Sequence, residues 1–158
     1  MWRFQTPRAA RLLARWLDPP GTAPEDVSAV SVLVCLYREW QIAGRELERL
    51  ARALTRRRFS EGLQSLERGC TSIRIAGGLV ELVERGRVAG PAGQLRSALL
   101  VEIRPWLEAA RRELPAAATH LCTLAADAAR RDQVAAALQQ LDERLAAEQA
   151  ASRRLTGS

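Results

Sequence analysis

Six arginines between residues 45 and 58 are the residues best suited to binding chemistry. Four follow helical steps of four, three and four residues and two come directly after them, which gives Arg45, Arg49, Arg52, Arg56, Arg57 and Arg58. Steps of three and four place side chains on one face of an α-helix. Because guanidinium groups bind phosphates and carboxylates through paired hydrogen bonds, this face is a candidate surface for nucleic acid or an acidic protein. The alternative is a solvated face whose arginine stems cover the edge of the core.

Side chains suited to catalysis are scarce in this sequence. His120 is the only histidine, and its neighbours on the predicted helix are mostly apolar, so we expect an ordinary packed or exposed side chain and not a catalytic or metal-binding one. The three cysteines, Cys35, Cys70 and Cys122, lie far apart among apolar neighbours, so we expect buried thiols in a reducing compartment. No glycine-rich stretch carries the lysine and serine or threonine of a P-loop. The sequence therefore predicts a protein that is not an enzyme, with no cofactor and no metal.

The chain as a whole is strongly basic. Its 158 residues carry a formal charge of +6, and all 24 basic residues are arginine. Such a balance favours acidic partners, namely nucleic acid, an anionic membrane surface or an acidic protein. The complete absence of lysine is typical of a GC-rich coding sequence, so the number of arginines alone is weak support for phosphate binding.

Helices must position these arginines, because the helix formers Ala, Leu, Arg, Glu and Gln dominate the composition. Apolar residues recur at steps of three and four between residues 27 and 86, a pattern that predicts buried helix faces. The core positions of this apolar ladder are Leu33, Leu36, Trp40, Leu47, Leu50, Leu54, Phe59, Leu63 and Leu66. A step of five, from Leu54 to Phe59, cannot stay on one face, so we expect a break between residues 54 and 61.

The predicted fold is a compact all-α bundle of about five helices. Its length favours one domain, with residues 1–23 as a basic arm with a short helix and loop, 24–152 as a single helical domain and 153–158 as a frayed tail. Pro105 and Pro115 should each start a helix or introduce a kink. No apolar run is long enough to span a bilayer. Residues 1–17, rich in arginine, could instead contact a membrane surface or form an organellar transit peptide.

A second fold is suggested by resemblance to winged-helix proteins. Residues 42–69 resemble the two helices of a winged helix-turn-helix, although the turn between them is shorter than in that family. The resemblance implies a recognition helix over residues 55–68, with Arg56 to Arg58 near its N-terminus, where groove contacts are made. In another register, residues 71–88 and 98–114 resemble winged-helix regulators of the multiple-antibiotic-resistance type. The implied fold is mainly α, with a small β-hairpin over residues 86–103.

Two functions follow from these patterns. The preferred one is a non-catalytic interaction protein or complex subunit, which associates with a protein partner or with itself through apolar helix stripes. The alternative is a basic DNA-binding regulator of winged-helix type that uses Arg45–Arg58. We expect a cytoplasmic location, or an organellar matrix if residues 1–17 are a transit peptide.

Overall fold

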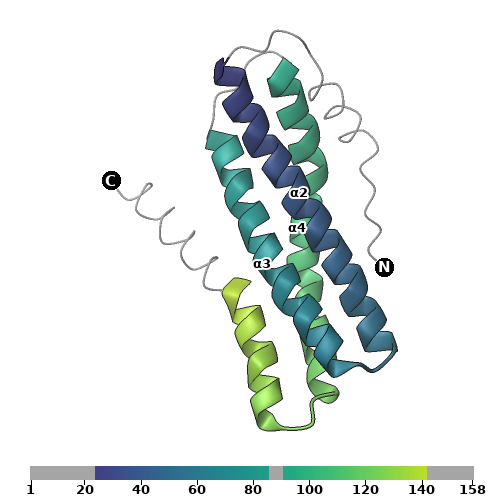
Figure 1. The fold of residues 1–158 in the computed structure, drawn as a ribbon. Helices are drawn as coiled ribbons and strands as arrows, with labels where there is room; N and C mark the ends of the chain where they lie inside the picture. Colours follow the sequence, from purple (N-terminus) through teal and green to yellow (C-terminus); the bar gives the residue numbers. More distant parts are fainter. Residues whose placement is uncertain (1–23, 86–90, 142–158) are drawn as a thin grey trace.

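Residues 24–85 and 91–141 are described by the computed structural model, and every regular element among them is a helix. The long helices are α2 (Pro24–Thr55), α3 (Phe59–Arg85) and α4 (Pro91–Thr123), and a shorter helix covers residues 128–141. The three long helices lie side by side, and the shorter helix lies beside the first half of α3 (Figure 1). The prediction of an all-α bundle is confirmed. The predicted arm and tail, the proposed roles of residues 1–17 and the end of the predicted domain lie outside the described residues.

A three-residue turn joins α2 to α3, as the step of five from Leu54 to Phe59 predicted. The Arg58 N–H donates to the Ala53 carbonyl at 2.9 Å, and the Arg57 N–H donates to the Leu54 carbonyl at 3.2 Å. This pair of bonds is a Schellman motif, which ends a helix with one left-handed residue, most often glycine. Here that residue is Arg57, with a φ of 55°. The turn sends α3 back along α2 in the antiparallel direction (Figure 1).

The hydrophobic core lies where the long helices meet. Of the apolar ladder, the buried members are Leu33, Leu36, Trp40, Leu47, Leu50 and Leu66. The partly buried members, which pack against this core, are Leu54, Phe59 and Leu63. From α4 the buried side chains include Leu95, Leu99, Ile103, Leu114 and Leu121. The shorter helix adds Val134, Ala137 and Leu141. The ladder is therefore used inside the molecule, in the core of a single chain.

Small residues on α3 allow close packing against α2 and α4. A Cβ atom added to Gly62 would lie 2.8 Å from Leu121 Cδ1. A Cβ atom added to Gly69 would lie 3.7 Å from both Glu46 Cβ and Leu47 Cδ2. The missing Cβ of Gly62 therefore leaves room for Leu121 of α4, whereas at Gly69 the helices α2 and α3 meet at an ordinary van der Waals distance. We call this contact between α2 and α3 the α2–α3 seam.

Of the predictions about residues 86–123, the hairpin was wrong, and of the two alternatives for the prolines the start of a helix does not occur. Residues 91–103 belong to α4, so the β-hairpin does not form there, and residues 86–90 lie outside the described part. Pro105 and Pro115 lie inside α4 rather than at the start of new helices. Both are exposed, on the side where water can reach the carbonyl group that each proline leaves without a donor. The described residues consequently form four helices, slightly fewer than the five expected.

The conformation of Arg57 generates a stability prediction. We expect Arg57→Gly to raise the free energy of unfolding by about 1 kcal/mol, because glycine adopts a left-handed conformation without the steric cost of a Cβ atom. Urea unfolding followed by circular dichroism measures the change. Arg57→Ala is the matched control, since it removes the same charge and keeps the Cβ atom. An equal gain in both variants would assign the effect to charge repulsion and contradict the backbone explanation.

Gly69 allows a test of the α2–α3 seam. Gly69→Ala should stabilise the protein by about 0.5 to 1 kcal/mol, because alanine favours the helix and the new Cβ atom meets its neighbours at an ordinary 3.7 Å. Gly69→Leu should instead lower the free energy of unfolding by about 1 to 3 kcal/mol, since a larger side chain overpacks the seam. Thermal unfolding of both variants provides the comparison. Equal tolerance of leucine and alanine would argue against close packing at Gly69.

Candidate functional site

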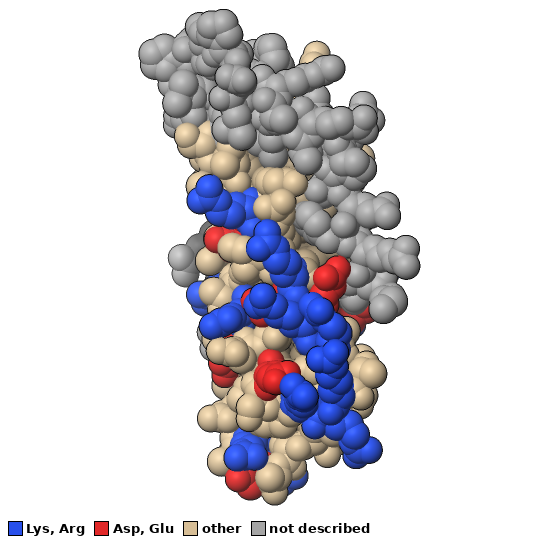
Figure 2. Space-filling view, turned by 45° about the vertical axis from the view of Figure 1, so that its right-hand side comes forward, with Lys and Arg blue, Asp and Glu red and all other residues tan. Residues whose placement is uncertain are grey.

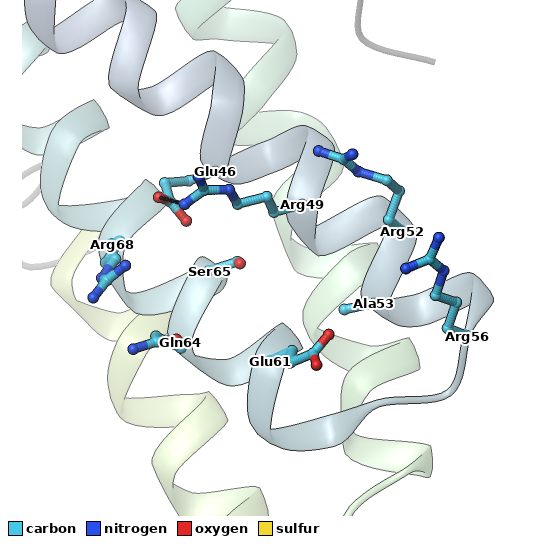
Figure 3. A pocket seen from close by; sticks show the side chains of 9 residues that line it. All are labelled: Glu46, Arg49, Arg52, Ala53, Arg56, Glu61, Gln64, Ser65 and Arg68. Atoms are coloured by element: carbon cyan, nitrogen blue, oxygen red, sulfur yellow. Dashed lines mark hydrogen bonds and ion pairs between the residues drawn. The ribbon is translucent and has the colours of Figure 1, made fainter.

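A polar cleft opens between the last turns of α2 and the first turns of α3 (Figure 3). Its volume is about 300 Å³. The residues that line it are Glu46, Arg49, Arg52, Ala53, Arg56, Glu61, Gln64, Ser65 and Arg68. We call it the arginine cleft. Four guanidinium groups against two carboxylates give it a net positive charge.

α2 contributes three of the arginines at helical spacing. Arg49, Arg52 and Arg56 follow steps of three and four, which brings them to the same side of the helix. Arg49 Nη1 donates to Glu46 Oε1 at 2.9 Å, and Glu46 is buried. The dashed line in Figure 3 marks this ion pair, which joins the exposed Arg49 side chain to the buried Glu46 carboxylate. Glu46 thus neutralises one arginine and fixes its direction.

α3 contributes the opposite wall. Glu61 and Arg68 are seven residues apart, two helical turns, with Gln64 and Ser65 between them on the same side. The Ser65 side chain and the Glu61 carboxylate point into the space between the two helices (Figure 3). Glu61 Oε1 also accepts a hydrogen bond from Arg58 Nη1 at 3.0 Å. Both carboxylates of the cleft therefore have an arginine partner.

Three cleft arginines have no acidic partner. Among the residues that the structure describes, Arg52, Arg56 and Arg68 form no ion pair. Other arginines are used internally: Arg104 Nε, for example, donates to Glu84 Oε1 at 2.7 Å and joins α4 to α3. Figure 2 shows how basic side chains gather on one face of the molecule. The cleft presents unneutralised guanidinium groups to an incoming anion.

The six arginines selected from sequence do not all meet at one place. Arg49, Arg52 and Arg56 line the cleft, whereas Arg45 is exposed on α2 outside it. Arg57 lies in the turn, and Arg58 pairs with Glu61. Sequence analysis missed Arg68. The signal that could have found it is the predicted break after Leu54, because an antiparallel α3 places its second and third turns beside Arg49.

Groups suited to catalysis do not converge on the cleft. His120 is exposed near the end of α4. Within the described residues, no group of three or more His, Cys, Asp or Glu side chains could hold a metal ion. Burial raises the pKa of the Cys70 thiol from 9.0 to about 12, which keeps it protonated and poorly nucleophilic. What the cleft can do chemically is bind anions.

Comparison with known proteins adds no family to these observations. No protein-family model matches the chain, and no significant match is found among curated proteins or solved structures. Of the described helices, none is long and apolar enough to cross a membrane. Function is therefore inferred from the site alone.

Of the three cysteines expected to be buried only Cys70 is, and a comparison of Cys70 with exposed Cys35 tests the packing of the core. At pH 8 in the native state, we expect a thiol reagent to modify exposed Cys35 much faster than Cys70, whose pKa of about 12 leaves almost no thiolate. Mass spectrometry of proteolytic peptides measures the labelling of each residue over time. In denaturant the two cysteines should react at similar rates. Equal rates in the native protein would contradict the burial of Cys70.

Proposed function

We propose that this protein is a non-catalytic helical interaction protein that binds an acidic partner in the arginine cleft. The observation that carries the proposal is the set of guanidinium groups of Arg52, Arg56 and Arg68, which form no ion pair with any residue that the structure describes. Guanidinium groups donate paired hydrogen bonds to carboxylate and phosphate oxygens. An anion that enters the cleft meets several such donors at once, on two helices held together by the core.

The binding surface differs from the one that the sequence favoured. The apolar ladder supplies the core of a single chain, where Leu36 and Leu66 are fully buried. Association through those residues would require the bundle to open. The arginine cleft is formed without any such change. We therefore still propose an interaction protein, but its contact surface is the charged side of α2 and α3 and not the apolar ladder.

The structure around the cleft lowers the cost of binding. Glu46 forms an ion pair with Arg49, and the α2–α3 seam holds the two walls of the cleft, one on α2 and one on α3, at a fixed spacing. Groups that are ordered before a partner arrives lose less conformational entropy on binding. Arg52, Arg56 and Arg68 remain long exposed side chains and contribute attraction that salt will screen.

Nucleic acid is the second candidate for the anionic partner. Arg45 and Arg57, which also lack an ion pair among the described residues, extend the basic surface beyond the cleft. A winged-helix mode of binding is disfavoured, because residues 91–103 are helical where a wing was expected. For a nucleic acid we accordingly expect sequence-independent contacts with phosphates. The affinity of such contacts falls steeply as salt is added.

The cleft predicts a specific pattern of binding to a poly-glutamate probe. The triple variant Arg52→Gln, Arg56→Gln, Arg68→Gln should bind a fluorescein-labelled poly-glutamate peptide about tenfold more weakly than the wild type at low salt. Fluorescence anisotropy measures the Kd. The matched control is Arg74→Gln, Arg112→Gln, Arg131→Gln, which removes three exposed arginines outside the cleft. Its Kd should stay close to that of the wild type.

Two outcomes would contradict the proposal. Equal loss of affinity in both triple variants would show that binding depends on net charge and not on the cleft. No binding of poly-glutamate by the wild type at low salt would exclude an acidic partner for the cleft. Labelled duplex DNA, titrated in parallel, tests the second candidate, which requires that DNA binds more tightly than poly-glutamate and that Arg45→Gln weakens it.

A further inference from the structure

One row of α3 side chains changes from charged to apolar along its length. Glu61, Arg68, Ile75 and Leu82 follow one another at steps of seven residues. Seven residues are close to two helical turns, so such a row stays on nearly the same side of the helix. Glu61 and Arg68 line the arginine cleft. The same side of α3 therefore continues from the cleft to Ile75 and Leu82.

A matching row lies on α2. Arg56, Arg49, Ile42 and Cys35 are also separated by steps of seven, and the first two line the cleft. Because α2 and α3 are antiparallel (Figure 1), both rows begin at the turn and lead away from it. Their charged ends meet in the arginine cleft, and the apolar residues of both rows follow in the direction away from the turn. We call the surface made by these two rows the α2–α3 face.

The apolar end of this face is open to solvent. Ile75 is 41% exposed and Leu82 is 59% exposed. Cys35 is exposed as well, and Ile42 is partly buried. The described residues contain one further large exposed hydrophobic side chain, Val101 on α4, which belongs to neither row. Exposed apolar side chains grouped beside a charged cleft are typical of a surface that binds another protein.

We propose that the α2–α3 face binds one amphipathic helix of a partner protein, with carboxylates at one end and apolar side chains at the other. This rests on the proposed function, because the carboxylates occupy the arginine cleft. The apolar side chains of the partner cover Ile75 and Leu82. From Glu61 to Leu82 the face is roughly 32 Å long at 1.5 Å per residue, the length of a helix of about 21 residues. Helices that lie in a groove of this kind use anchors at spacings of three, four and seven.

The distribution of charge argues against two other occupants. A nucleic acid carries phosphates along its whole length, so it would leave Ile75 and Leu82 without apolar contacts. A second copy of the chain would dock through the same face about a two-fold axis. In such a pair, the arginine end of one face would lie against either the arginine end or the apolar end of the face on the other copy. A partner helix with carboxylates at one end and apolar side chains at the other complements both ends of the α2–α3 face at once.

The test uses three labelled 21-residue peptides and the intact chain. The first peptide has glutamates at steps of three and four in one half and leucines at the same steps in the other. The second has the same composition with glutamates and leucines intermixed, and the third is poly-glutamate. Fluorescence anisotropy at low salt gives each Kd. We expect the wild type to bind the first peptide about tenfold more tightly than either of the others.

The decisive variant is Ile75→Ser combined with Leu82→Ser, two exposed positions whose replacement leaves the core intact. It should lose the preference for the first peptide and keep its affinity for poly-glutamate. Val101→Ser is the matched control and should behave as wild type. Circular dichroism and thermal unfolding establish that all variants are folded. An unchanged preference in the double variant would overturn the inference, while loss of poly-glutamate binding in the cleft triple variant would still support the proposed function.

Two further results would also overturn it. One is tighter binding of the intermixed peptide than of the first peptide. The other is a dimer of the wild type in light scattering that dissociates in the Ile75→Ser, Leu82→Ser variant, since this would assign the face to a second copy of the chain. A wild-type monomer with the expected peptide preference would support the inference.

Discussion

The close antiparallel packing of α2 against α3 is the interaction on which the rest of the structure depends. A turn of three residues reverses the chain, and small residues, Gly62 on α3 and Ala53 on α2, lie opposite each other beside it. The last turns of α2 then face the first turns of α3, so that Arg56 and Arg68 share one cleft although they are on different helices. The same packing buries Glu46 beneath Arg49. The arginine cleft and a large part of the hydrophobic core are thus formed by the same pair of helices.

Helix termini explain how so many cations are tolerated at one end of this pair. The C-terminal end of an α-helix carries a partial negative charge, and the N-terminal end a partial positive charge. Arg52 lies in the last turn of α2, where a cation is favourable, and Glu61 lies in the first turn of α3, where an anion is favourable. Repulsion among the guanidinium groups is also reduced by the ion pairs of Arg49 and Arg58. Enough positive charge is left over to attract an anion.

The sequence predicted features that depend on local periodicity and missed features that depend on packing. The break after Leu54 and the shared face of Arg49, Arg52 and Arg56 follow from spacing alone. Arg68 could not be assigned in this way, because its place in the cleft depends on how two helices pack. The exposure of Pro105 and Pro115 likewise depends on which side of α4 faces the core, so a local rule could not decide between the start of a helix and a proline inside one. The hairpin expected over residues 86–103 failed for a different reason: Leu95, Leu99 and Ile103, at steps of four, are buried on one side of a helix.

The short turn between α2 and α3 has a consequence for how the chain folds. Among the three long helices, α2 and α3 share the largest contact, and residues on either side of the turn meet after closing only a small loop. Small loops cost little chain entropy, and proteins rich in such local contacts fold quickly. The helical hairpin of α2 and α3 can therefore form early, before α4 docks on it. In that order of events the arginine cleft, whose lining residues all lie between positions 46 and 68, is complete before α4 joins the bundle.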